Sequence, residues 1–250
     1  MRTEDMLDFS SRLADAARRF SVRQIAGALI VNGETQFSAA HAEFDCDTPQ
    51  PVFCLAKVMT ASLIALAIER GRLSIDTPVE EFLDFDGGDR RVTKRHLIGH
   101  MHGWENAAPL ARRRDANGFI AAEDILTTLA RKPRLHAPGA MYSYDSAGYL
   151  LLGAVLERIH GARFDDILQR HLFAPLAMFG AEAPASACPA GDGDGISLSV
   201  RDLSRFVAFH LPGGADAARL LAPRVLDCAG MESVLPGRVA RMARSRRRLA

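Results

Sequence analysis

The segment from 54 to 70, CLAKVMTASLIALAIER, is almost continuously apolar and constrains the fold more than any other feature of the chain. A helix that is apolar on every side is buried on most sides, so this segment predicts a central helix inside a large core. Gly71 follows it as a plausible residue after the C-cap. The 250 residues, of which 48% are hydrophobic and 24% charged, allow one large globular domain or two small ones around such a helix.

Local patterns on either side of this helix predict a mixture of helices and strands. Residues 6–20 have apolar side chains at mostly helical spacing, which predicts an amphipathic first helix. The pair Asn32-Gly33 separates two strand-like runs, 25–31 and 34–40, and is a strong signal for a β-hairpin. A capping box at 77–80, with proline at the first helical position, predicts a short helix. Further helices are predicted at 92–101, 121–131, 146–159 (stopped by Gly161), 164–173 and from the Ser199 cap to about 210. Residues 180–195 are predicted to form a loop.

The charge balance excludes some classes of partner. Thirty-one Lys and Arg against 30 Asp and Glu leave a net charge of +1, so no global field attracts nucleic acid or a membrane. The first twenty residues have no apolar stretch typical of a signal peptide, and we expect a cytoplasmic protein. Residues 238–250 are rich in arginine and are interpreted as a flexible basic tail; an arm that binds nucleic acid or an acidic partner is the alternative.

Two short motifs carry chemically useful side chains. Cys54 and Lys57 lie one helical turn apart at the start of the apolar helix. A helix N-terminus and a nearby ammonium both favour a thiolate, which is the nucleophilic form of cysteine. A small buried apolar residue is the alternative interpretation of Cys54. The second motif is Tyr142-Ser143-Tyr144-Asp145-Ser146, just before the helix predicted at 146–159.

The other cysteines are Cys46, Cys188 and Cys228, and no pair has C-x-x-C spacing, which favours a reduced compartment over a disulfide framework.

Together these segments resemble the serine β-lactamase and penicillin-binding-protein superfamily, in its class C, esterase-like branch. The resemblance covers about residues 6–228. It implies an α/β fold of the α+β type, with a helical subdomain (about 75–195) packed on an antiparallel sheet in a single domain, 1–237. It also implies acyl-enzyme chemistry. The segments that carry it are KVMTA (57–61), IERGRLSIDTPVEEFL (68–83), VTKRHLIGHMHGW (92–104), PGAMYSYDSAGYLLLGAVLERIHG (138–161) and ISLSVRDLSRF (196–206).

The resemblance assigns roles to six residues. Cys54 occupies the nucleophile position, where the family has serine, and Lys57 and Tyr144 match the catalytic lysine and the tyrosine of the Tyr-x-Asn motif. Ser146, Asp145 and His102 are the candidate substrate-binding residues: Ser146 stands in the asparagine position, and His102 stands where the family commonly has a small polar residue. Core packing for Tyr144, and turn or N-cap chemistry for Asp145 and Ser146, are the alternatives.

A later motif of the family, Lys-Thr-Gly or His-x-Gly on a strand, is not found after Ser199. We therefore expect a second copy of the chain or another polypeptide to complete the sheet at the hairpin edge, 25–40. A truncated chain and a fold reused without catalysis are the alternatives. His96, His100 and His102 lack a carboxylate or cysteine at ligand spacing, so no metal and no cofactor is predicted.

The predicted function is a hydrolase or transacylase that forms an acyl-enzyme on Cys54 with a small-molecule ester, amide or thioester. A catalytically silent protein that binds a ligand or a partner is the alternative.

Overall fold

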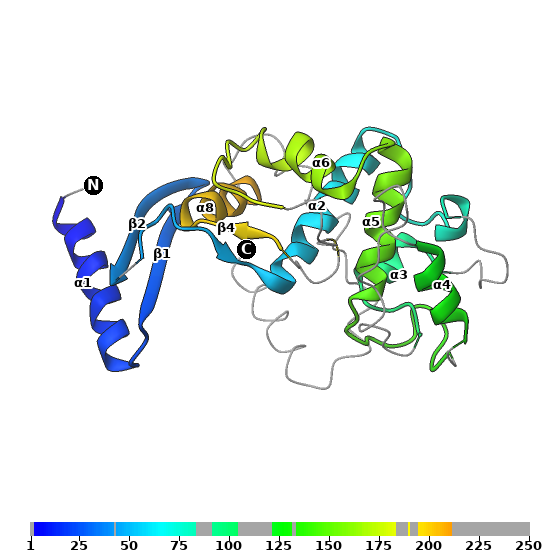
Figure 1. Ribbon diagram of the computed structural model, residues 1–250, viewed down its shortest axis with the longest axis horizontal. Helices are drawn as coiled ribbons and strands as arrows, with labels where there is room; N and C mark the ends of the chain where they lie inside the picture. The colour runs from blue at the N-terminus through cyan, green and yellow to red at the C-terminus, as the bar shows by residue number, and fades with distance from the viewer. Residues whose placement is uncertain are drawn as a thin grey trace, which may run out of the picture.

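Two apolar helices form the centre of the computed structural model, which describes residues 3–42, 44–83, 92–104, 122–131, 134–183, 190 and 195–211 (Figure 1). They are α2 (Ala56–Glu69) and α5 (Ala147–His160), which pack against each other and are buried over most of their lengths. The core predicted around the first of them is thereby confirmed. The structure also has α2 begin two residues after Cys54, which lies in a separate 3-10 turn, η1 (Phe53–Leu55).

Glycines end both central helices as the sequence predicts. Gly71 has a φ of 67°; its N–H donates to the Ile68 carbonyl, and the Arg72 N–H donates to the Ala67 carbonyl, each at 2.9 Å. This pair of hydrogen bonds is a Schellman motif. Gly161, with a φ of 61°, ends α5 in the same left-handed region.

The predicted hairpin forms from β1 (Gln24–Val31) and β2 (Glu34–Ala42), which are antiparallel and, among the described residues, pair only with each other. Asn32 and Gly33 both have positive φ, as a two-residue turn of type I′ requires. The helices α1 (Thr3–Arg19) and α8 (Val200–Phe209) pack on this hairpin and lie on opposite sides of it in Figure 1. Ser199 caps α8 by accepting a hydrogen bond from the Asp202 N–H at 3.0 Å.

Shorter helices surround α5. They are α3 (Lys94–Ile98), α4 (Ala122–Arg131) and α6 (Phe164–Leu168), and α6 continues into a π-helical turn, η4 (Gln169–Phe173). The capping box predicted at 77–80 is wrong. Pro78 is extended and forms an antiparallel bridge with Thr93, and only a 3-10 turn, η2 (Val79–Glu81), follows it. The pairing with a distant segment overrides the local cap.

A second, very small sheet lies beside the start of α2. It consists of β3 (Gln50–Pro51) and β4 (Ser197–Leu198), which are antiparallel, and the Val52 N–H donates to the Ile196 carbonyl at 3.1 Å. This sheet fixes the chain just before Cys54. The tail predicted at 238–250, most of the loop predicted at 180–195, Cys188 and Cys228 lie outside the described residues.

The described helices include none with both the length and the apolar character needed to cross a membrane.

Candidate active site

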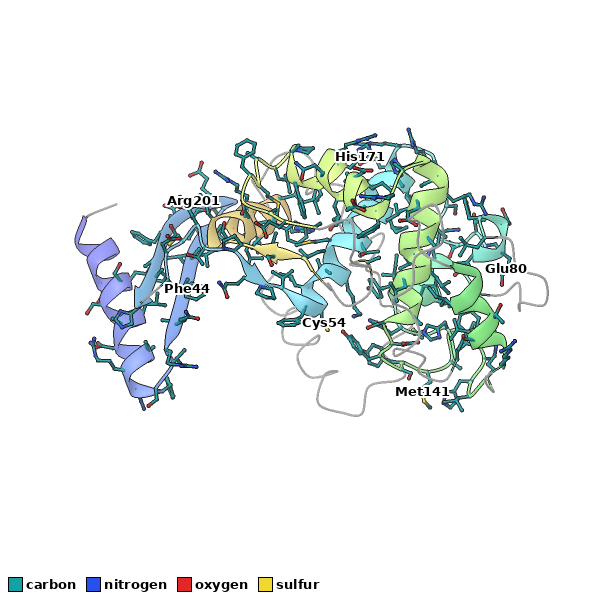
Figure 2. The ribbon with its side chains drawn as sticks, in the orientation of Figure 1. Phe44, Cys54, Glu80, Met141, His171 and Arg201 are labelled. Carbon is teal, nitrogen blue, oxygen red and sulfur yellow. The ribbon has the colours of Figure 1, made fainter. Side chains whose placement is uncertain are left out.

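The turn before α2 presents Cys54 to solvent. Phe53, which precedes it, has a φ of 44°, a left-handed conformation that is rare for a bulky residue. Backbone hydrogen bonds hold this conformation, because β3 fixes the preceding residues and the Leu55 N–H donates to the Val52 carbonyl at 3.1 Å. Figure 2 shows Cys54 at the start of α2, and the structure leaves it exposed. The strained turn therefore displays the thiol at the end of a rigid, buried helix.

Lys57 is buried one turn further on and joins the two motifs. Its residue is only 5% exposed, and its Nζ donates to Ser146 Oγ at 3.1 Å. The same ammonium lies 4.8 Å from the ring centroid of Tyr144 and 5.8 Å from that of Tyr149. A buried charge is costly unless it has partners, and a hydroxyl and two aromatic faces supply them here. Segments 89 residues apart thus meet at one amine.

Tyr144 lies against Lys57 and interacts with Cys54. Partial burial raises the pKa of Tyr144 above its ordinary value, and the interaction with Cys54 raises it further. The phenol is therefore protonated at neutral pH, and it is a source of a proton rather than a base.

Ser146 has a different role from the helix cap considered for it. It occupies the N-cap position of α5, but its side chain makes no cap hydrogen bond and accepts from Lys57 instead. Asp145 provides the cap, because its Oδ1 accepts from the Ala147 N–H at 3.0 Å. The residue in the family's asparagine position is thus in direct contact with the lysine, and its contact with a substrate stays a prediction.

His102 and Asp145 lie behind these groups as a buried pair. Both side chains are 1% exposed, and His102 Nε2 is 3.6 Å from Asp145 Oδ2. Nδ1 of His102 accepts from the Trp104 N–H at 3.2 Å, so Nε2 carries the hydrogen that faces the carboxylate. Burial, followed by Arg134 and His96, lowers the pKa of His102 to about 4, so the ring is neutral. In this position the two side chains support the second motif from within, and the substrate-binding role predicted for them stays a prediction.

His100 is a part of the site that the sequence analysis did not identify. Its Nδ1 accepts from the Asp145 N–H at 3.1 Å, and its carbonyl accepts from the Ser143 N–H at 2.8 Å. Its ring lies 4.6 Å from the ring of Tyr144 and 5.0 Å from that of Tyr149. Burial and the nearby Lys57 lower the pKa of His100 to about 4. A neutral imidazole therefore holds the backbone of the second motif. Nothing in the sequence indicates this contact, because no periodicity links His100 to residues 142–146.

Within the part of the chain that the structure describes, no group of three or more His, Cys, Asp and Glu side chains is placed to hold a metal ion. The chemistry available at the site comes from a thiol, an amine and a phenol. This set is sufficient for covalent acyl transfer, in which a nucleophile attacks a carbonyl and neighbouring groups move protons.

Comparison with known proteins gives relatives that match about half of the chain. Penicillin-binding protein 4 of Amycolatopsis lactamdurans is 31% identical over 129 residues, which are 50% of this chain and 33% of that protein. D-aminopeptidase of Brucella ovis is 27% identical over 147 residues, 58% of this chain and 28% of that protein. Monacolin J acid methylbutanoyltransferase of Aspergillus terreus is 27% identical over 154 residues, 53% of this chain and 37% of that protein. The chain thus spans about a third of the length of these relatives.

Solved structures show the same fold. The structure of SurE with D-Leu superposes with a TM-score of 0.72 at 22% identity, over 90% of this chain and 58% of that one. A β-lactamase/D-alanine carboxypeptidase from Yersinia pestis, complexed with citrate, has a TM-score of 0.67 at 17% identity, over 86% of this chain and 73% of that one. These likenesses confirm the predicted α/β fold of the β-lactamase type. The family model described as Beta-lactamase matches residues 13–230, and the chain therefore belongs to the β-lactamase family.

Proposed function

We propose that this chain is a hydrolase or acyltransferase that forms a covalent thioester on Cys54. One observation carries the proposal: an exposed thiol and a buried lysine both interact with the same protonated tyrosine. The named relatives support the general class, since they include penicillin-binding proteins, an aminopeptidase and an acyltransferase. The cysteine nucleophile and the acyl-enzyme are the finer part of the proposal.

The first half-reaction forms the thioester. Cys54 attacks as the thiolate: a sulfur electron pair forms the new C–S bond with the carbonyl carbon of an ester, amide or thioester, while the carbonyl oxygen takes the negative charge. The backbone N–H of Cys54 is one candidate donor to that oxygen. When the intermediate collapses, the bond to the leaving group breaks. Tyr144 is the candidate proton donor to the leaving group, because its raised pKa keeps the hydroxyl proton available.

The second half-reaction releases the acyl group. Water, an alcohol or an amine attacks the thioester carbonyl, the C–S bond breaks, and the sulfur leaves as a thiolate. The tyrosinate formed in the first step accepts the proton of the attacking group, and the ammonium of Lys57, 4.8 Å from that ring, stabilises the negative charge in between. Water as the acceptor gives hydrolysis, whereas an alcohol or amine gives acyl transfer.

Intact-mass measurement with an electrophilic acylating probe tests the proposal. An activated ester is expected to add one acyl group to the protein, and peptide mapping should locate it on Cys54. The Cys54→Ala variant should remain unlabelled, and Cys46→Ala is a matched control because Cys46 is also a free cysteine outside the site. Labelling spread evenly over all four cysteines, or none on Cys54, would favour a silent ligand- or partner-binding protein.

The lysine is tested by the same assay. The Lys57→Met variant keeps a long side chain but removes the positive charge, so Cys54 should label more slowly at neutral pH. An unchanged rate would mean that the amine does not act on the sulfur.

A further inference from the structure

A group of basic side chains gathers at the end of α2 opposite Cys54, and Figure 2 labels His171 there, away from Cys54. Arg70 and Arg72 follow the last turn of α2, His160 ends α5, and His171 lies in η4. The rings of His160 and His171 are 4.6 Å apart between centroids. These four residues, here called the Arg–His cluster, have no part in the proposed acyl chemistry.

Hydrogen bonds determine which atoms the Arg–His cluster presents. Arg70 Nη1 lies 3.1 Å from His171 Nδ1, and Arg72 Nη1 lies 3.4 Å from His160 Nδ1. A guanidinium group has donors only, so each Nδ1 is the acceptor and each imidazole carries its hydrogen on Nε2. A metal ion would need a lone pair on the nitrogen it binds. Because the Nδ1 lone pairs already accept hydrogen bonds from the arginines, the Arg–His cluster presents N–H donors, and these suit an anion.

The electrostatics of the Arg–His cluster agree with this geometry. Burial, followed by His171, Arg72 and Arg70, lowers the pKa of His160 to about 4. Burial also lowers the pKa of His171, followed by Arg70, Arg72 and Arg170. Within the described part of the chain, the charged neighbours that shift these two pKa values are therefore all cationic. The imidazoles stay neutral because protonation would add positive charge to a group that is already positive.

A simpler explanation accounts for part of this arrangement. Basic side chains are favourable at helix C-termini, and Arg72 also donates to the carbonyl of Ile159 at 3.4 Å. That explanation covers single residues, but it does not explain why two arginines are each directed at an imidazole in a contacting pair.

We propose that the Arg–His cluster binds a doubly charged tetrahedral oxyanion, such as a phosphate group. Arginine matches the geometry of phosphate oxygens with parallel N–H donors, and the two Nε2–H groups add to them. The site lies at the opposite end of α2 from the thiol, so this inference stands independently of the proposed function.

Proton linkage gives the site a distinctive property. A bound dianion favours the charged form of a neighbouring imidazole, so binding raises the pKa of His160 and of His171. The complex then takes up protons. Sulfate, which stays doubly charged, should therefore bind more tightly as the pH is lowered from about 8 to about 5.

The test is a titration of the full chain, with histidine side chains labelled with nitrogen-15 and observed by NMR. Inorganic phosphate and sulfate are the soluble probes, and phosphatidylcholine vesicles that contain phosphatidic acid form a separate arm. Saturable shifts of the His160 and His171 signals with inorganic phosphate would identify a soluble ligand. If the His160 and His171 signals shift saturably with the vesicles but not with inorganic phosphate, the ligand is a phosphate group on a lipid.

Exposed arginines supply the variants. Arg70→Gln and Arg72→Gln should each raise the phosphate dissociation constant by about two- to fivefold, as expected for one exposed charge pair. Arg201→Gln, at an exposed arginine that pairs with Asp47 instead, is the matched control and should leave it unchanged. A denaturant titration without phosphate shows whether each variant is folded. If Arg72→Gln does not fold, Arg70→Gln alone provides the test.

The proposal is overturned if neither probe gives a saturable shift, or if Arg201→Gln weakens binding as much as Arg70→Gln does. It is also overturned if the sulfate dissociation constant is the same at both ends of the pH range.

Discussion

Replacing Tyr144 by phenylalanine removes one hydroxyl from the site and leaves the rest of the side chain in place. The ring contacts with Lys57, at 4.8 Å, and with His100, at 4.6 Å, do not involve the hydroxyl and should remain. The hydroxyl proton that the proposed mechanism transfers to the leaving group is lost. The variant therefore measures how much Tyr144 contributes as a proton donor when Cys54 is acylated.

The size of the effect follows from the role of the hydroxyl and from its exposure. A positioned proton donor contributes about 10²–10⁴-fold to a rate, and water competes with it at a residue that is 44% exposed, so the lower value, about 10²-fold, applies. Acylation of Cys54 by an amide, whose leaving group needs a proton, should therefore slow by about 10²-fold. Alkylation by iodoacetamide releases iodide, which needs no proton, and should keep its rate.

The assay is the rate at which an amide acylates Cys54, followed by intact mass and peptide mapping, with iodoacetamide labelling as the reference. Tyr142→Phe is the matched control, because this neighbouring tyrosine also packs against His100 and should change neither rate. If a folded Tyr144→Phe protein is acylated as fast as the wild type, Tyr144 is not the proton donor and the reasoning is refuted.

Three further predictions concern the framework. Gly103→Ala should lower the free energy of unfolding by at least about 3 kcal/mol in denaturant titrations, since a Cβ there would lie 2.0 Å from the His136 carbonyl oxygen. A Cβ at Gly161 would have no atom of the described residues within 4 Å, so Gly161→Ala should cost only about 1–2 kcal/mol of backbone strain. Equal losses would contradict this. The pKa values of His100 and His102 are lowered from 6.5 to about 4, so the unfolded chain binds more protons and stability should fall as the pH drops from 6.5 toward 4. The free energy of unfolding should change by at most about 1.4 kcal/mol per pH unit for each histidine. Denaturant titrations at several pH values measure it, and a free energy of unfolding that does not change with pH would contradict the prediction. We also propose that a second copy or another polypeptide covers the hairpin edge at 25–40, so that sedimentation and thermal unfolding depend on protein concentration; a monomer with a concentration-independent transition would disprove this.

Features set by local chemistry were predictable from the sequence. Asn32-Gly33 specified the hairpin turn because its two residues adopt positive φ readily, and Gly71 and Gly161 specified the ends of the two central helices for the same reason. The Ser199 cap was readable because a hydroxyl and the Asp202 N–H three residues on satisfy each other. In each case the deciding contact spans only a few residues.

Features set by distant contacts were not predictable. Pro78 left its expected helix because Thr93 pairs with it, and β3 and β4, two residues each, are too short to produce any alternation. The position of His100 under the tyrosines depends on contacts across more than forty residues. The sequence did suggest that Lys57 and the second motif belong together, but only through resemblance. The hydrogen bond to Ser146 is a property of the folded chain.

The placement of α1 and α8 about the hairpin has a consequence for the order of folding. The first helix and both strands are contiguous in the chain, so they can associate as soon as they emerge during synthesis. The partner for the other side, α8, follows about 160 residues later. During that interval, none of the helices in the described ranges other than α8 is available to cover that face of the hairpin. Closure of this part of the molecule is therefore a late, long-range step, and nascent chains that stop before residue 200 should be the ones most prone to aggregate or to require a chaperone.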